Sequence, residues 1–250
     1  MELFWAIVFF VFGITFGSFF NVVGLRVPKE IAFTTDRSYC PNCYHQLRWF
    51  ELIPVLSYII QIGKCRNCKQ KISPIYPFVE LLTGILYAYS YATFGFTVEL
   101  FTAIVFISLL MIILVTDIAY MLIPNKILLF FLPLAIIARI ISPLTPWYDA
   151  IIGAVVGFVL LAIIIIVSKG GMGAGDMKLF GVIGIILGWQ NVLLTFFLAS
   201  LFGAVIGIIL IWAKVIKRRQ PVPFGPYIVA GAIISYFYGN DIISAYLSLL

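Results

Sequence analysis

Long apolar runs dominate this chain and restrict what it can fold into. A helix needs about 20 mainly apolar residues to cross the hydrocarbon core of a bilayer. With 63% hydrophobic and 10% charged residues, the 250-residue chain carries more apolar surface than a soluble fold of this length buries. Eight segments stand out, at 3–25, 77–95, 100–120, 125–142, 149–168, 177–189, 191–213 and 223–240. They predict an all-α polytopic membrane protein with about eight transmembrane helices, several of them short.

The first apolar segment and one long polar loop suggest a three-part organisation. Glu2 stands where a signal peptide would carry basic residues, and no small-residue cleavage site follows, so we expect residues 1–25 to form a retained transmembrane helix. Residues 26–76 form the only long extramembrane loop, and we expect residues 77–250 to form a core of seven further helices.

The basic residues predict the orientation of these spans. Eight of the sixteen lie in the loop, which the positive-inside rule places in the cytosol. Alternation of the spans puts most of the others on the same face: Lys126, Lys169, Lys178, Lys214, Lys217, Arg218 and Arg219. Only Arg139 departs from the pattern, and both termini are predicted to be external. The net charge of +6 is then explained by topology and contact with anionic membrane lipid, and we expect no nucleic-acid partner.

All four cysteines lie in the loop, as Cys40-Pro-Asn-Cys43 and Cys65-Arg-Asn-Cys68. Two Cys-x-x-Cys pairs are typical of a structural zinc site with four thiolate ligands. Free or redox-active thiols remain an alternative, whereas a disulfide is disfavoured in a reducing cytosol. His45 is the only histidine, and we expect it to be structural because four thiolates already complete the zinc shell.

Two aspartates occupy places where a bilayer makes a carboxylate costly. Asp117 lies inside an apolar run, and Asp176 follows the glycine-rich stretch 170–175 at the start of another. Such residues are functional by default, and two of them suggest an acid/base pair. The glycine-rich stretch lacks the Gly-Lys-Ser/Thr ending of a phosphate loop, so we expect its glycines to permit a close backbone approach.

A set of motifs, in order along almost the whole chain, resembles the type IV prepilin peptidases. They are Gly17–Val23, Arg26–Pro28, the two cysteine pairs, Trp49–Ser57, Gly63–Cys65, Ser73–Gly84, Asp117, Gly173–Lys178 and Pro223–Pro226. The resemblance implies a membrane aspartyl endopeptidase whose catalytic pair maps onto Asp117 and Asp176. It also implies that the enzyme removes a basic leader from type IV prepilins or pseudopilins at the cytosolic face of the bacterial inner membrane.

The same resemblance implies that the enzyme then methylates the new N-terminus with S-adenosylmethionine. No segment shows a known motif for this cofactor. We expect it to bind in the loop, with Glu51, Gly63, Lys64 and Glu80 as candidates. Ordinary structural roles compete for each residue: a solvated charge for Glu51 and Lys64, a turn for Gly63 and a buried ion pair for Glu80.

Two other classes use paired membrane carboxylates. A presenilin-like protease carries a tyrosine before its first aspartate, whereas Thr116 precedes Asp117, and it has no tetracysteine loop. A proton-coupled transporter would spread its polar residues across the bilayer midplane. The sequence leaves open which pilin system is served, which aspartate is the acid and what the oligomeric state is.

Overall fold

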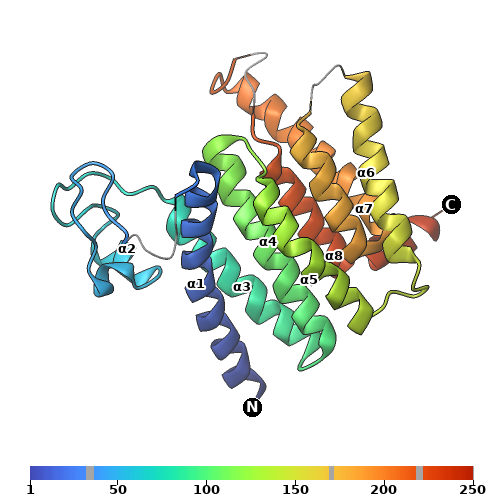
Figure 1. Ribbon diagram of the computed structural model, residues 1–250, viewed down its shortest axis with the longest axis horizontal. Coiled ribbons are helices and arrows are strands. Elements are labelled where there is room, and N and C mark those ends of the chain that lie inside the picture. Colours follow the sequence, from blue (N-terminus) through green and yellow to red (C-terminus); the bar gives the residue numbers. More distant parts are fainter. Residues whose placement is uncertain (32–36, 169–171, 218–221, 250) are drawn as a thin grey trace. The chain divides into compact units, whose positions relative to one another are not determined.

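The computed structural model describes residues 1–31, 37–168, 172–217 and 222–249. Within these ranges every regular element is a helix (Figure 1). Two isolated β-bridges, Tyr39 with Gln46 and Lys64 with Lys71, lie in the loop. The predicted all-α class is therefore confirmed. Several residues used in the sequence interpretation lie outside the described ranges: Lys169, Gly170, Gly171, Arg218 and Arg219.

Five helices in the described ranges are long and apolar enough to cross a membrane, so the chain is a multi-pass membrane protein. They are α1 (Glu2–Arg26, with the short helix η1, Val27–Lys29, after it), α4 (Val98–Tyr120), α6 (Asp149–Val167), α7 (Ala174–Trp212) and α8 (Gly225–Leu247). The remaining long helices are α3 (Ile75–Phe94) and α5 (Asn125–Ile141). Eight crossings stay a prediction, which requires that α3 and α5 also cross the membrane and that α7 crosses it twice.

Helix α7 is interrupted in its middle. Its 39 residues would extend about 58 Å, roughly twice the hydrocarbon thickness of a bilayer. Gly188, with φ 79° and ψ 174°, has a non-helical backbone that only glycine adopts readily. The break lies near the end of the apolar segment predicted at 177–189, just before the one predicted at 191–213, so α7 consists of two helical segments.

Arg139 has its partners at this break. Its Nε donates to the carbonyl oxygen of Ile186 at 2.8 Å, and its Nη1 donates to Ser142 O at 3.2 Å. Carbonyls at a helix end have no partner within the helix, and they are costly to leave unpaired away from water. Arg139 satisfies one of them, which explains a basic residue on the side of the protein where the charge pattern predicts none.

The chain divides into two compact units, Met1–Val115 and Thr116–Leu250, with the boundary inside α4. In the first unit, α1 and α3 run antiparallel in close contact. A Cβ added at Gly13 would lie 2.7 Å from Gly84 Cα, and one at Gly17 would lie 2.8 Å from Glu80 Cα. Small residues here allow the two backbones to approach, as in other membrane helix pairs.

In the second unit, three helix N-termini gather beside the end of α4. Lys178 Nζ in α7 donates to Asn125 Oδ1 at the start of α5, at 2.9 Å. Gly175 in α7 packs against Ile123, where a Cβ would lie 2.9 Å from the Ile123 Cβ. The close approach predicted for the glycine-rich stretch is therefore present at Gly175.

Candidate active site and metal centre

Asp117 is held near the C-terminal end of α4 by the first residue of α8. Its Oδ2 accepts the backbone N–H of Gly225 at 2.6 Å, and the side chain is buried, with 6% of its surface exposed. The first N–H groups of a helix have no intrahelical acceptor and carry partial positive charge. The start of α8 thus supplies a preorganised donor to a carboxylate that has left water.

Asp176 lies in the first turn of α7 and is partly exposed. Its Oδ2 accepts the backbone N–H of Gly173 at 3.1 Å, which closes the helix start in the manner of a capping box. The starts of α7 and α8 both adjoin the end of α4, where Gly175 packs against Ile123 and Gly225 donates to Asp117, so the two aspartates lie at neighbouring helix ends of the second unit. The structure thus brings together a buried and a partly exposed carboxyl, each oriented by a backbone donor.

The four cysteines form a compact cluster in the first unit. The Cys40 and Cys68 sulfurs lie 3.8 Å apart, the Cys43 and Cys65 sulfurs 3.9 Å apart, and all four lie within 4.8 Å of one another. Four thiolates around one zinc ion at 2.3 Å would lie about 3.8 Å apart. The donor set and its spacing therefore fit a tetrahedral zinc ion.

The two cysteine pairs have the same local structure. In each, the N–H of the first cysteine bonds to a carbonyl five residues on, at 2.9 Å for Cys40 and 2.8 Å for Cys65. The asparagine of each pair donates to the last sulfur of the other, from Asn42 to Cys68 and from Asn67 to Cys43, both at 3.6 Å. The backbone N–H of Gln70, with the Asn42 amide, lowers the pKa of the Cys68 thiol to about 6. These donors favour the thiolate form that binds metal.

Glu51 is buried beside the cysteine cluster in the short helix η2 (Trp49–Leu52). Its Oε2 accepts the Arg48 N–H at 2.9 Å and lies 3.3 Å from His45 Nε2. Burial disfavours the charged form, but the Arg48 N–H and the His45 ring, with a smaller contribution from Arg66, bring the pKa of Glu51 below its ordinary value. His45 is therefore partnered by Glu51.

Glu80 lies in α3 and is also buried. Its Oε2 accepts the backbone N–H of Val55 at 2.7 Å, and the Ser18 side chain of α1 hydrogen-bonds to it as well. Glu80 therefore connects the loop to α1 and α3 and does not line either of the two loop cavities.

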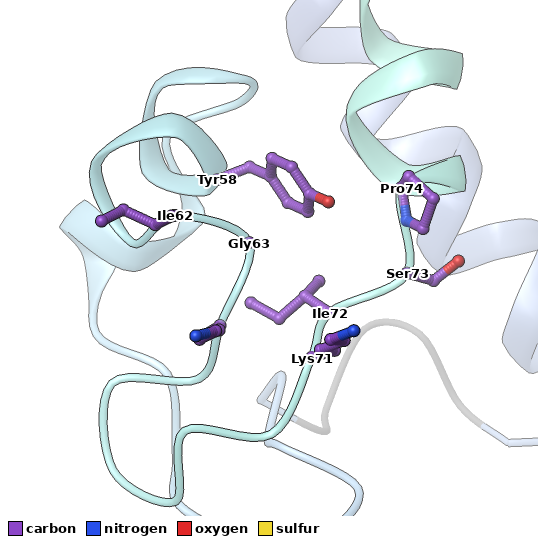
Figure 2. A pocket seen from close by; sticks show the side chains of 8 residues that line it. Tyr58, Ile62, Gly63, Lys71, Ile72, Ser73 and Pro74 are labelled. Atoms are coloured by element: carbon purple, nitrogen blue, oxygen red, sulfur yellow. The ribbon is translucent and has the colours of Figure 1, made fainter.

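Gly63 and Lys64 line a cavity of about 460 Å³ between the end of α2 (Leu56–Ile60) and the segment that leads into α3. Figure 2 shows the Tyr58 ring extending across this cavity toward Pro74. A Cβ at Gly63 would lie 2.9 Å from Tyr58 Cζ and Oη, and Gly63 has φ +64°. The position accordingly requires glycine for both space and backbone conformation.

Comparison with known proteins places this arrangement in a family. The model of the bacterial peptidase A24 N-terminal domain matches residues 11–94, and that of the type IV leader peptidase family matches residues 104–208. A protein of Bacillus subtilis named prepilin leader peptidase/N-methyltransferase is 47% identical over 97% of this chain and 98% of its own length. The chain belongs to the type IV leader peptidase family.

Relatives of the same name from more distant bacteria support this membership. The one from Pseudomonas aeruginosa is 33% identical over 94% of this chain and 91% of its own length. The one from Aeromonas salmonicida is 34% identical over 96% and 93%, respectively. No solved structure matches the chain.

Within this leader peptidase, the N-terminal match contains the four cysteines, and the C-terminal match contains both aspartates. Three further residues beside the sites were not predicted from the sequence. The sequence assigned Gly225 no role of its own, although its N–H donates to Asp117. It assigned Asn42 and Asn67 none either, although each is the third residue of a Cys-x-Asn-Cys pair and donates to a cysteine sulfur. The same asparagine in both cysteine pairs is the sequence signal that could have identified these two residues.

Proposed function

We propose that this chain cleaves the basic leader from type IV prepilins or pseudopilins and then N-methylates the new N-terminus with S-adenosylmethionine. The names of its relatives support both activities. The observation that carries the peptidase assignment is the pair Asp117 and Asp176, at adjoining helix ends of one unit, each with a backbone donor. Structural carboxylates in a membrane protein are usually neutralised by a basic partner, and none of the contacts described for these two involves one.

Two neighbouring carboxyls in a partly dry site share one proton readily. The ionised member takes a proton from a water molecule, which attacks the scissile carbonyl, while the protonated member donates a hydrogen bond to the carbonyl oxygen. Collapse of the tetrahedral intermediate then breaks the C–N bond, and the departing amine takes up the proton that the ionised aspartate removed from water. We assign Asp117 as the ionised member, because it accepts its helix-start N–H at 2.6 Å, a closer contact than the 3.1 Å at Asp176, and short hydrogen bonds are typical of a charged acceptor.

The proposed topology places this chemistry at the cytosolic face of the bacterial inner membrane. Eight crossings with external termini would put the end of α4 and the starts of α7 and α8 on the same side as the basic loop. A prepilin has a basic leader and a long apolar helix, so its cleavage bond would lie at that surface while the helix stays in the bilayer.

Two cofactors follow from this assignment. Cys40, Cys43, Cys65 and Cys68 would hold a structural zinc ion that stabilises a loop with little core of its own. S-adenosylmethionine would supply the methyl group from the cavity lined by Gly63 and Lys64, whose size suits a small cofactor. Lys64 and Lys71 would hold its carboxylate. Glu51 and Glu80 would position η2 and the 53–56 turn beside it.

The peptidase proposal is tested with Asp117→Asn and Asp176→Asn in purified protein and a synthetic prepilin. Each variant should insert normally, since a neutral amide is easier to bury than a carboxylate, and each should lose leader cleavage. Asp241→Asn is the matched control, because Asp241 is exposed at the far end of α8. Cleavage by either dyad variant at more than a few per cent of the control rate would rule the assignment out.

A further inference from the structure

The segment between the two cysteine pairs exposes large apolar side chains although it is too short to span a membrane. Five of them, Trp49, Leu56, Ile59, Ile60 and Ile62, are between 55% and 82% exposed and are here called the apolar ridge. Ile62 also borders the cavity that Gly63 lines, and in Figure 2 its side chain extends to the side opposite the Tyr58 ring. An exposed apolar surface of this kind, outside the transmembrane helices, marks contact with a partner or with lipid.

Cationic side chains border the ridge. Lys64, Arg66, Lys69 and Lys71, here called the basic rim, are all exposed. The residues that line a second cavity, of about 530 Å³, include the apolar Phe50, Ile53, Ile60 and Ile62 and the cationic Lys64, Arg66 and Lys69. The Arg66 guanidinium lies 5.4 Å from the centre of the Phe50 ring, which holds it at the border of the apolar and charged parts.

The loop is attached to α1 and α3 near the start of α3. Pro54, Val55 and Leu56 form a tight turn in which Leu56 N–H bonds to Pro54 O at 2.6 Å, and Val55 has φ +63° and ψ −52°, a rare and strained conformation for a β-branched residue. Glu80 holds this turn through the Val55 N–H. Because Glu80 is about 8 Å from the start of α3, the ridge begins close to that helix end, which the proposed topology puts at the cytosolic membrane surface.

From these three observations we infer that the apolar ridge and basic rim form a peripheral docking surface for anionic phospholipid. The ridge would enter the headgroup and upper acyl region, while Arg66 and Lys69 of the rim would contact lipid phosphates from the second cavity. A leader peptide is itself basic and would be repelled by the rim, so charge complementarity favours lipid as the occupant. The loop would then be held on the bilayer at both its Glu80 contact and its ridge.

The test uses the full chain in nanodiscs, which present lipid on both faces. The fluorescence of Trp49 is obtained as the difference between the wild type and Trp49→Phe. Brominated phospholipids should quench this signal more strongly than aqueous iodide does, and the lipid quenching should increase when phosphatidylglycerol replaces part of the phosphatidylcholine. High salt should reverse that increase because it screens exposed charges.

Arg66→Gln with Lys69→Gln should remove the dependence on phosphatidylglycerol. Lys214→Gln removes an exposed charge outside the loop and should leave the dependence intact. Zinc content equal to that of the wild type checks that the double variant keeps a folded loop. Quenching of Trp49 by iodide alone in every lipid mixture, or identical quenching with and without phosphatidylglycerol, would overturn the inference.

A photocrosslinking residue separates lipid from a second copy of the chain. Placed at Ile60, benzoylphenylalanine should give lipid adducts on irradiation, whereas at Tyr44, which directly follows the first cysteine pair and is 76% exposed, it should give few. A covalent protein dimer as the main product at Ile60 would show that the ridge is a subunit interface and not a lipid surface.

Discussion

Gly225 is the residue on which the placement of the Asp117 carboxyl most depends. A Cβ at this position would lie 2.7 Å from both Cβ and Oδ2 of Asp117. Gly225→Ala should therefore displace the carboxyl and its N–H donor together. Since displacements of about 1 Å in an active site can cost about 100-fold in rate, we expect a loss of that order in prepilin cleavage.

Gly207→Ala is the matched control for this substitution, because nothing lies within 4 Å of an added Cβ at Gly207. Both variants change a helical glycine to alanine in the second unit, and thermal stability in detergent checks that both stay folded. If Gly225→Ala cleaved prepilin as fast as Gly207→Ala, the close fit of Gly225 against the Asp117 carboxyl would not limit the reaction.

At the zinc site, substitutions beside the four ligands should weaken zinc binding as well. Purified protein should contain about one zinc per chain, and serine at any one of the four cysteines should remove it and make the loop sensitive to protease. Asn42→Ala and Asn67→Ala should each weaken zinc binding by about 10-fold to 100-fold, because each amide donates to a ligand sulfur.

Gln70→Ala provides the comparison, since its side chain is exposed and its contact with Cys65 is made by the backbone. Competition with a chromogenic chelator measures the affinities. Protein purified without zinc, or with a disulfide between the two cysteine pairs, would contradict the metal assignment. Unchanged zinc affinity in both asparagine variants would show that Asn42 and Asn67 do not contribute to metal binding.

At the scale of helices, the break in α7 depends on a glycine conformation and a buried guanidinium. Gly188→Ala places a side chain in a region of φ and ψ that costs alanine about 1–3 kcal/mol, and the new Cβ would also collide with the Asp149 carboxyl. Arg139→Met leaves the Ile186 carbonyl without its donor, at a similar cost. Both variants should unfold at lower temperature in detergent than Gly181→Ala, whose Cβ would make only ordinary contacts. Equal stability of all three would show that the break is held by other contacts.

Much of this helical arrangement is predictable because bilayer thickness limits the length of apolar segments. The sequence predicts a break in the apolar run near residue 190, and Gly188 interrupts α7 there. Hydropathy could not explain Arg139, because its partner is a backbone carbonyl 47 residues away along the chain. The sequence also allowed Glu51 to be a solvated charge and Glu80 to form a buried ion pair, since only the folded loop reveals the N–H groups of Arg48 and Val55 that let these carboxylates be buried.

On the scale of the whole molecule, the two proposed activities belong to different compact units. Asp117 and Asp176 lie in the unit Thr116–Leu250, whereas the cysteine cluster and the cavity beside Gly63 lie in Met1–Val115. Hydrolysis by an aspartate pair needs no cofactor, and methyl transfer needs no second carboxyl. The predicted division into residues 1–25, 26–76 and 77–250 likewise assigns the two reactions to different segments.

The two reactions should therefore be separable by mutation. Asp117→Asn should lose cleavage yet still methylate a synthetic mature pilin peptide that already has a free N-terminal phenylalanine. Lys64→Ala and Glu51→Ala should reduce methylation more than cleavage, because Lys64 lines the proposed cofactor cavity and Glu51 positions η2 beside it. The informative quantity is the ratio of the two rates in one preparation, with labelled S-adenosylmethionine for methylation and a gel shift for cleavage. Equal loss of both activities in every loop variant would show that the loop only supports the structure. If the wild type transferred no methyl group, the protein would be a peptidase without methyltransferase activity.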